Sequence, residues 1–438
     1  MGTIFSAILA ALCLAESFRN LKQGLVLFLL SLLFAPYMVI GSKHIRIELL
    51  LTPLLAGILL VRYDIRSLRI PYSVWPLLAL WGYTFAITLI SVILGLTSSP
   101  AWLNAYAYLR PVILVFLFAN VGFSSSDLVR ILRWFAASAI PLSLLAIGQT
   151  FNLPLAAEIT INSYVSPGRP VIERMMEELG FILRAVSVFE TPAYAATYFL
   201  STLVTSIYLL FELRGKMAEQ RSFVMLLLSL VASLVGGALT LSATFVAGIS
   251  FLLFLLFLRL TWHNKVRAIL LSLTLGACVF GYLILIGKEE KYASIANNIT
   301  YQIRRVVTLE LFETRYAEHT GYLSITMKEI GDNPLVGYGW TKKRGVFIGD
   351  SMYVVLLYQS GIVGFMIFLW WITMTYRTVK SNPPSREMFI FWLSTLLVSG
   401  MGSPSFFIPR LNDWWWSLCG IGISLASLDT LSKTETPT

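Results

Sequence analysis

Thirteen apolar runs of near-membrane length constrain this chain more than any other feature of its sequence. They fall at 4–17, 24–40, 47–61, 72–96, 108–122, 131–150, 191–211, 222–238, 243–258, 268–287, 351–376, 388–402 and 414–428. A helix needs about 20 apolar residues to cross a bilayer, and these runs lack the alternation of barrel strands. Only 13% of the 438 residues are charged, against about 25% in soluble proteins. The pattern predicts an all-α, polytopic membrane protein forming one integral domain, residues 1–438.

Two details leave the number of transmembrane helices at about 12 to 13. The run at 4–17 is short for a full crossing, so a tilted, re-entrant or interfacial helix stays open as an alternative. It lacks a basic n-region and a cleavage site, and we expect a mature span rather than a removed signal. The apolar stretch 222–258 is too long for one span. Its Gly236-Gly237 pair and Ser242 predict a tight turn.

Basic residues mark one side of the predicted membrane. Sixteen of the 33 Lys and Arg residues lie in six short loops at alternate connections. These loops carry Arg19/Lys22, Arg62/Arg66/Arg69, Arg130/Arg133, Arg214/Lys216/Arg221, Arg259/Lys265/Arg267 and Arg377/Lys380/Arg386. Cytoplasmic loops are enriched in Lys and Arg, so orientation accounts for the net charge of +10. We therefore expect the lipid bilayer as a partner and no nucleic acid.

The remaining connections then lie outside, and two of them are long. The outer segments are 41–46, 97–107, 151–190, 239–242, 288–350 and 403–413. Prolines punctuate the first long loop, 151–190, in which Glu173–Leu179 is predicted to form a short amphipathic helix. The main loop, 288–350, is polar and nearly neutral. A loop of this length between spans is usually functional.

The main loop contains one clear helical pattern, Glu310–Gly331. Its apolar stripe consists of Phe312, Tyr316, Leu323, Met327 and Ile330. Its polar stripe consists of Arg315, His319, Tyr322, Thr326 and Glu329. The polar stripe is either a plain solvated face or part of a site. In the Asn333–Trp340 segment that follows, Gly337 and Gly339 permit an unusual backbone and close approach.

Arg184 and Asp350 each lie just outside a membrane boundary, beside the start of a span. An arginine can bind phosphate through two parallel hydrogen bonds. A carboxylate at a helix start can stay ionised and act as a general base. The structural alternatives are an interfacial snorkelling arginine for Arg184 and an N-cap for Asp350. Arg304 and Arg305 offer a second contact for an anionic group.

Other conspicuous residues have structural explanations. The three cysteines, Cys13, Cys278 and Cys419, lie in apolar runs, and the chain has three histidines, so we expect neither a metal site nor another cofactor. The Trp414–Trp416 triplet, with Arg410 and Asp413, lies at an outer boundary and suits an aromatic belt facing the headgroups. Tyr106, Tyr108 and Arg110 form a similar external cluster.

These motifs, in this order and at this topology, resemble the O-antigen ligase/polymerase superfamily. Arg315 followed by a helix and Asn333-Pro-Leu-Val-Gly-Tyr-Gly339 matches the signature of the family's large loop. Arg184, Phe189 and Pro192 match its Arg-x-x-x-x-Phe-x-x-Pro before a span. Two positions depart from the family: Ala193 stands where Asn often follows the proline, and Ser242-Ala243 stands where many members have Ser-Arg.

The end of the main loop favours one subfamily. Ligases resemble one another in a His-Asn-x-x-Leu there, whereas this chain has Asp350-Ser351, as in Wzy-type polymerases. The resemblance implies a metal-independent glycosyltransferase of the bacterial inner membrane, acting on the periplasmic face. Its partners would be undecaprenyl-pyrophosphate-linked glycans, as donor and acceptor, with a chain-length regulator as a further candidate.

The resemblance also implies roles for named residues. Arg184, Arg315 and Asp350 would be catalytic. Substrate contacts would come from Arg304, Arg305, His319, Tyr338 and Tyr353. Two alternatives stay open: an O-antigen ligase that transfers the glycan to lipid A core, and a transporter or flippase for lipid-linked sugars. Transporters place ionisable residues inside the membrane, whereas here they gather outside it, which favours external chemistry.

Overall fold

The computed structural model describes most of the predicted membrane region. The described residues are 2–40, 43–95, 102–153, 155–164, 172, 184–212, 220–259, 301, 304, 308, 310, 323–341, 346 and 351–434. Within them the helices are α1 (Gly2–Arg19), α2 (Leu21–Phe34), α3 (Ile47–Arg62), α4 (Val74–Ile93), α5 (Trp102–Ala119), α6 (Ser125–Ala137), α7 (Ala139–Thr150), α8 (Ala156–Tyr164), α10 (Pro192–Glu212), α11 (Gln220–Leu239), α12 (Ala243–Arg259), α16 (Ser324–Asp332), α17 (Met352–Val379), α18 (Pro383–Ser399) and α19 (Leu411–Thr434). Strands within this part of the chain are confined to one hairpin, β1 (Met38–Ile40) with β2 (Lys43–Ile45), in which Val39 pairs with His44.

The fold is all-α and suggests a multi-pass membrane protein. Among the described residues, six helical stretches are long and apolar enough to cross a membrane: α1, α4, α6 with α7, α10, α11 and α17. Twelve of the thirteen predicted runs are helical, and the run at 268–287 lies outside the described residues. The first run forms an 18-residue helix, α1, longer than the sequence pattern predicted.

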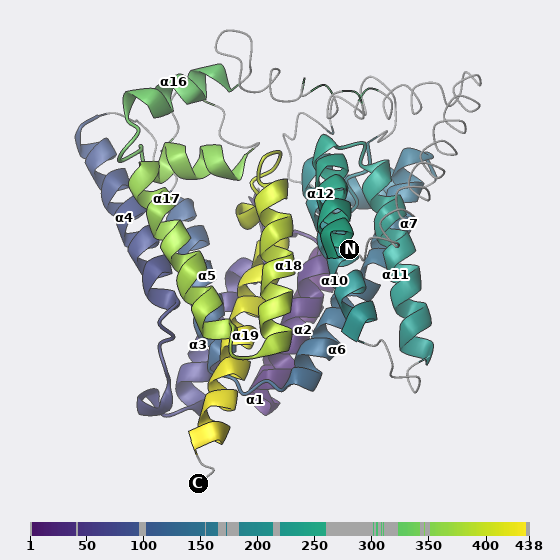
Figure 1. The fold of residues 1–438 in the computed structure, drawn as a ribbon, viewed down its shortest axis with the longest axis horizontal. Helices are drawn as coiled ribbons and strands as arrows, with labels where there is room; N and C mark the ends of the chain where they lie inside the picture. Colours follow the sequence, from purple (N-terminus) through teal and green to yellow (C-terminus); the bar gives the residue numbers. More distant parts are fainter. Residues whose placement is uncertain are drawn as a thin grey trace.

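Helices α10 and α19 form the centre of the bundle (Figure 1). α19 packs along α5, and α10 packs against α11, α12 and α18. The sequence of α10 permits this because its serine and threonine hydroxyls bond back to carbonyls of their own helix, as Ser201 does to Thr197. Gly236 of α11 lies directly against the ring of Phe199, where a side chain would collide. Small residues let membrane helices approach closely, as here.

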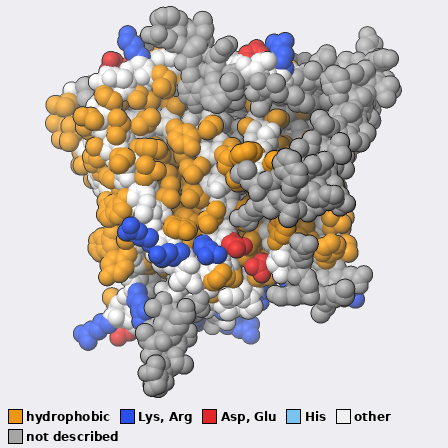
Figure 2. Space-filling model, in the orientation of Figure 1, with side chains coloured by type: hydrophobic (Ala, Val, Ile, Leu, Met, Phe, Trp, Pro, Cys, Tyr) orange, Lys and Arg blue, Asp and Glu red, His pale blue; other side chains and the backbone are white. Residues whose placement is uncertain are grey.

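Three hydrogen bonds join segments that the basic residues place on the same side of the membrane. At one end, which we call the basic end, Arg62 of α3 donates to Phe18 of α1, and Tyr208 of α10 donates to Pro384 of α18. At the opposite end, which we call the loop end, Tyr37 N–H donates to Ser163 O. Figure 2 shows an apolar face with charged side chains gathered along its upper and lower rims.

The tight turn predicted near Gly236-Gly237 and Ser242 is confirmed, because α11 ends at Leu239 and α12 begins at Ala243. Helix α17 covers the predicted apolar run at 351–376 but is not one continuous helix. Gly361 has φ 60° and breaks the helix, so its first part lies across the loop end and its second part runs down the bundle (Figure 1). Helix α8 was not predicted, since the prolines of 151–190 indicated a loop. The predicted Glu173–Leu179 helix lies outside the described residues.

The predicted aromatic belt at Trp414–Trp416 is wrong. The three indoles are 0%, 0% and 3% exposed. They pack in the core, with Trp415 stacked 6.2 Å from Trp392 and Trp416 4.7 Å from Trp371, both measured between ring centroids. The triplet lies in the first two turns of the central helix α19, where its side chains pack against neighbouring helices rather than facing lipid.

Candidate functional site

Arg184 lies at the loop end, where the first long loop returns to the bundle. Its half-buried side chain donates from Nε to the carbonyl of Thr240 at 3.5 Å. The next residue, Ala185, donates its N–H to Leu239 O at 3.0 Å. The Arg184 segment is therefore attached to the turn between α11 and α12. In that turn Leu241 takes a left-handed backbone, φ 46°, which is uncommon for a side chain of its size.

Hydrogen bonds continue from this turn to the end of the main loop. Thr244 Oγ1 donates to Gly402 O at 3.2 Å, and Ser351 Oγ donates to Gly400 O at 3.1 Å. Met352 N–H also donates to Gly400 O, at 2.9 Å. The Arg184 segment and Ser351 are thus both linked to the turn that follows α18, the first through the α11–α12 turn and the second directly. Asp350 itself lies outside the described residues, but its neighbour Ser351 is buried at this junction.

Gln149, at the end of α7, holds the Arg184 segment from the other side. Its side-chain Oε1 accepts the N–H groups of Val186 and Ser187 at 3.0 and 2.9 Å. Its Nε2 donates to Ser187 O at 3.0 Å. This bonding accounts for a residue, Ser187, at φ 51°. Strained backbone of this kind persists only where its surroundings enforce it, and it clusters at functional sites.

Arg410 is the second anchor, and it is buried rather than part of an external cluster. Its guanidinium donates to Val188 O at 3.1 Å and to Ala35 O at 3.0 Å. It also lies over the ring of Tyr164, 5.0 Å from its centroid. One side chain therefore joins the Arg184 segment, the end of α2 and helix α8. Its own backbone is left-handed, φ 71°.

A small recess beside Arg410 contains a buried carboxylate that the sequence motifs did not single out. Glu190 accepts a hydrogen bond from the hydroxyl of Tyr37. Burial, and then the charge of Glu190, raise the pKa of Tyr37 to about 12, so this phenol stays protonated as a donor. Tyr164, Tyr194 and Phe189 are among the other residues that line the recess. The sequence did offer one clue to Glu190, because it lies between Phe189 and Pro192 of the family-like motif.

The Asn333–Trp340 segment docks onto the break in α17. Tyr338 and Gly339 donate their N–H groups to Tyr358 O and Gln359 O, both at 2.8 Å. Ile362 N–H donates to Pro334 O, also at 2.8 Å. The segment thereby satisfies backbone groups that the break removes from the helical ladder, as buried backbone groups require.

The two glycines of this segment behave as predicted. Gly337 and Gly339 have φ of 77° and 72°. A Cβ added at Gly337 would lie 2.7 Å from the backbone nitrogens of Ser360 and Gly361. Gly339 lies as closely against Thr88 of α4. Close backbone approach therefore requires glycine at both positions.

The predicted substrate contacts fall into three groups. Tyr338 is buried, and its hydroxyl donates to Glu329 O at 3.2 Å, while the Tyr353 hydroxyl donates to Leu397 O at 2.9 Å. Both hydroxyls are thus engaged within the protein. Arg304 is exposed and pairs with Glu310 at 3.4 Å. Arg305, Arg315 and His319 lie, like Asp350, outside the described residues.

The predicted external cluster at Tyr106, Tyr108 and Arg110 is also buried in part. The guanidinium of Arg110 in α5 pairs with Asp413 of α19 at 2.7 Å, and both side chains are 2% exposed or less. Arg46 and Glu48 form a second pair nearby, at 3.3 Å. The Arg110–Asp413 pair ties the start of α19, and so the Arg410 turn, to α5, whereas the Arg46–Glu48 pair lies within the start of α3.

No protein-family model and no curated protein matches the chain. Among the described residues, His, Cys, Asp and Glu side chains nowhere gather in threes to hold a metal ion. The fold accordingly defines a broad class, an all-α protein with several apolar helices that suggest a multi-pass membrane protein. Its distinguishing feature is a polar junction at the loop end, where two long loops meet.

Proposed function

We propose that this chain is an O-antigen-type polysaccharide polymerase. It would join undecaprenyl-pyrophosphate-linked repeat units on the periplasmic face of a bacterial inner membrane. One observation carries the proposal beyond the sequence resemblance. Arg184 donates to Thr240 in the turn between α11 and α12, Thr244 of the same region donates to Gly402 after α18, and Ser351 donates to Gly400 beside it. Two motif positions more than 150 residues apart are thus held at one junction, as a shared site requires.

The chemistry follows from the residue types. The acceptor sugar's hydroxyl oxygen attacks the anomeric carbon of the donor glycan, and the bond from that carbon to the lipid pyrophosphate breaks. Asp350, next to the junction, accepts the hydroxyl proton. Arg184 and Arg315 bind the pyrophosphate and stabilise the negative charge that develops on it. The lipid stays in the bilayer beside the bundle while the grown glycan remains attached to the acceptor's lipid.

The experiment is single substitution in cells that make long-chain polysaccharide. Arg184→Ala, Arg315→Ala and Asp350→Ala are each expected to abolish long chains while single repeat units remain. Arg184→Lys should retain part of the activity, because it keeps the charge without the planar fork. Lys328→Ala, an exposed change in α16, is the matched control and should leave chain length unchanged. Normal chain length in all three alanine variants, at normal protein levels, would refute the proposal.

The same cells separate the alternatives. A ligase would leave bare lipid A core when the gene is disrupted, with no single repeat unit attached. A transporter would leave lipid-linked repeat units on the cytoplasmic face, where periplasmic glycosidases cannot reach them. Turnover of a lipid-linked repeat unit into longer glycans by the purified protein would support the polymerase directly.

A further inference from the structure

A recess of about 390 Å³ opens at the basic end of the bundle, opposite the loop end. Its walls come from the linker before α4, the ends of α5 and α17, and the second half of α19. Residues that bear on its chemistry are Arg69, Asn120, Thr378, Ile423, Ser424 and Ser427. A lining of hydroxyls and one guanidinium beside apolar side chains suits an amphipathic ligand.

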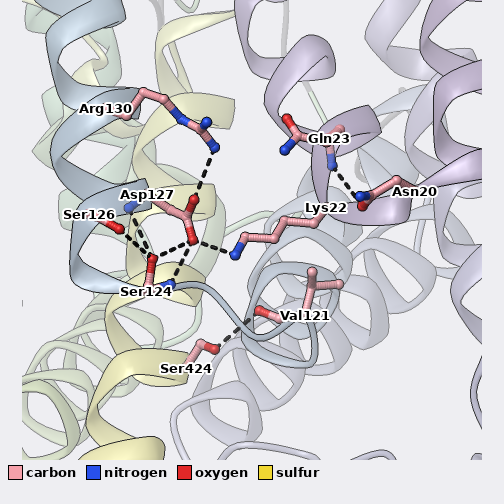
Figure 3. Close-up of polar contacts among 9 residues, drawn as sticks. All are labelled: Asn20, Lys22, Gln23, Val121, Ser124, Ser126, Asp127, Arg130 and Ser424. Carbon is pink, nitrogen blue, oxygen red and sulfur yellow. Dashed lines mark hydrogen bonds and ion pairs between the residues drawn. The ribbon is translucent and has the colours of Figure 1, made fainter.

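The rim of this recess is held in place rather than loosely assembled. Asn120 accepts the N–H of Arg69 at 2.8 Å and donates to its carbonyl at 2.9 Å. This pair of bonds fixes the backbone that carries the Arg69 guanidinium. Ser424 of α19 donates to Val121 O at 3.2 Å, which fixes the adjoining linker (Figure 3).

The far end of the same linker is fixed as well. Ser124 caps α6, and Asp127 accepts bonds from Ser124 and pairs with Arg130 at 2.9 Å. Lys22 of α2 reaches the same carboxylate (Figure 3). Two cations meeting one carboxylate leave the surroundings of the linker with excess positive charge. The linker that carries Gly122 of the recess is therefore held at both ends.

Exposed cations lie beside lining residues along the chain. Arg69 lines the recess and is exposed, Arg66 precedes the lining residue Ser67, and Arg377 and Lys380 flank Thr378; all three of these neighbours are exposed. The acid beside them, Asp64, accepts the N–H of Arg66 in a local turn. Figure 2 shows Lys and Arg side chains gathered along the lower rim of the apolar face. The mouth thus favours a ligand with negative charge.

Apolar and aromatic side chains beside the mouth indicate the depth of the recess in a membrane. Ile70, Tyr72 and Trp75 are 53%, 76% and 50% exposed. Exposed tyrosine and tryptophan are enriched at the headgroup level of membrane proteins. A charged group in the recess would therefore lie at headgroup depth, with the apolar surface of α4 and α17 available to acyl chains.

We propose that this recess binds the headgroup of an anionic phospholipid, with Arg69 contacting the phosphate. Basic pockets between helices at the cytoplasmic side of membrane proteins have this chemistry. A soluble phosphate would share the contact with Arg69 but would gain nothing from Ile70, Tyr72 and Trp75. The proposal does not depend on the polymerase activity, since the recess lies at the opposite end of the bundle.

Lipid binding to the purified full chain in detergent tests the proposal, with native mass spectrometry as the readout. Phosphatidylglycerol, phosphatidylcholine and inorganic phosphate are compared as probes. The wild-type chain is expected to retain phosphatidylglycerol in preference to phosphatidylcholine. Arg69→Gln should weaken that preference about fivefold, the effect of about 1 kcal/mol that one basic residue contributes near a lipid surface.

Arg221→Gln is the matched control, an exposed arginine at the start of α11 that does not line the recess. It should leave the preference unchanged. Equal loss in both variants would overturn the proposal, because it would show a general surface attraction. Equal retention of the two lipids, or displacement of the lipid by millimolar inorganic phosphate, would overturn it too.

Discussion

The two ends of the bundle are held by the same kinds of charged residue in opposite environments. At the loop end, Arg110 and Asp413 pair in the interior with almost no exposure. At the basic end, Asp127 pairs with Lys22 and Arg130, whose side chains are 28% and 46% exposed. Water screens the second cluster and not the first. Ion pairs therefore hold both ends, but each exposed cation at the basic end should contribute less to stability than the buried pair at the loop end.

The largest effect should follow from leaving one charge of the buried pair alone. Asp413→Ala strands Arg110 in the core and is expected to cost about 3–5 kcal/mol of stability. Thermal unfolding of the purified chain in detergent would measure the loss. The double variant Arg110→Met with Asp413→Leu should recover most of it, because it removes both charges and keeps the packing. A double variant no more stable than Asp413→Ala would contradict the role assigned to the pair.

A smaller effect is expected from the backbone contact that docks the main loop. Gly337→Ala places a Cβ against Ser360 and Gly361 at a left-handed residue, which should cost more than about 1–2 kcal/mol. Faster proteolysis within the main loop would report undocking. Gly331→Ala is the control, since a Cβ there meets nothing within 4 Å and α16 is helical at that position. Equal rates of proteolysis in the two variants would contradict the docking of the Asn333–Trp340 segment.

The smallest effect is expected at the basic end. Lys22→Ala removes a partly exposed ion pair and should cost no more than about 1 kcal/mol, because Arg130 still faces Asp127 and water solvates the remainder. The difference from wild type should shrink further as salt rises from 0.05 M to 1 M. A loss of stability in Lys22→Ala that is independent of salt and as large as that of Asp413→Ala would show that the two ends do not differ in this way.

Much of the fold could be predicted from the sequence because the deciding signals are local. Apolar length predicts a helix that can cross a membrane, and alternating basic loops predict which connections share a side. The turn after Leu239 and the close approach at Gly337 and Gly339 were likewise predicted from short stretches of sequence. Glycine and short polar breaks can be recognised without knowing what they touch.

What only the tertiary structure decided is which side of each apolar helix meets protein and which meets lipid. A helix that is apolar all round carries no amphipathic stripe, so Trp414–Trp416 and Arg110 looked like boundary residues and are core residues. The partners of the Arg184 segment could not be predicted from the sequence either. Hydrogen bonds to Thr240 and Leu239, and the anchors Gln149 and Arg410, come from distant elements that the bundle brings together. Long-range contact, rather than local pattern, places the two long loops at one junction.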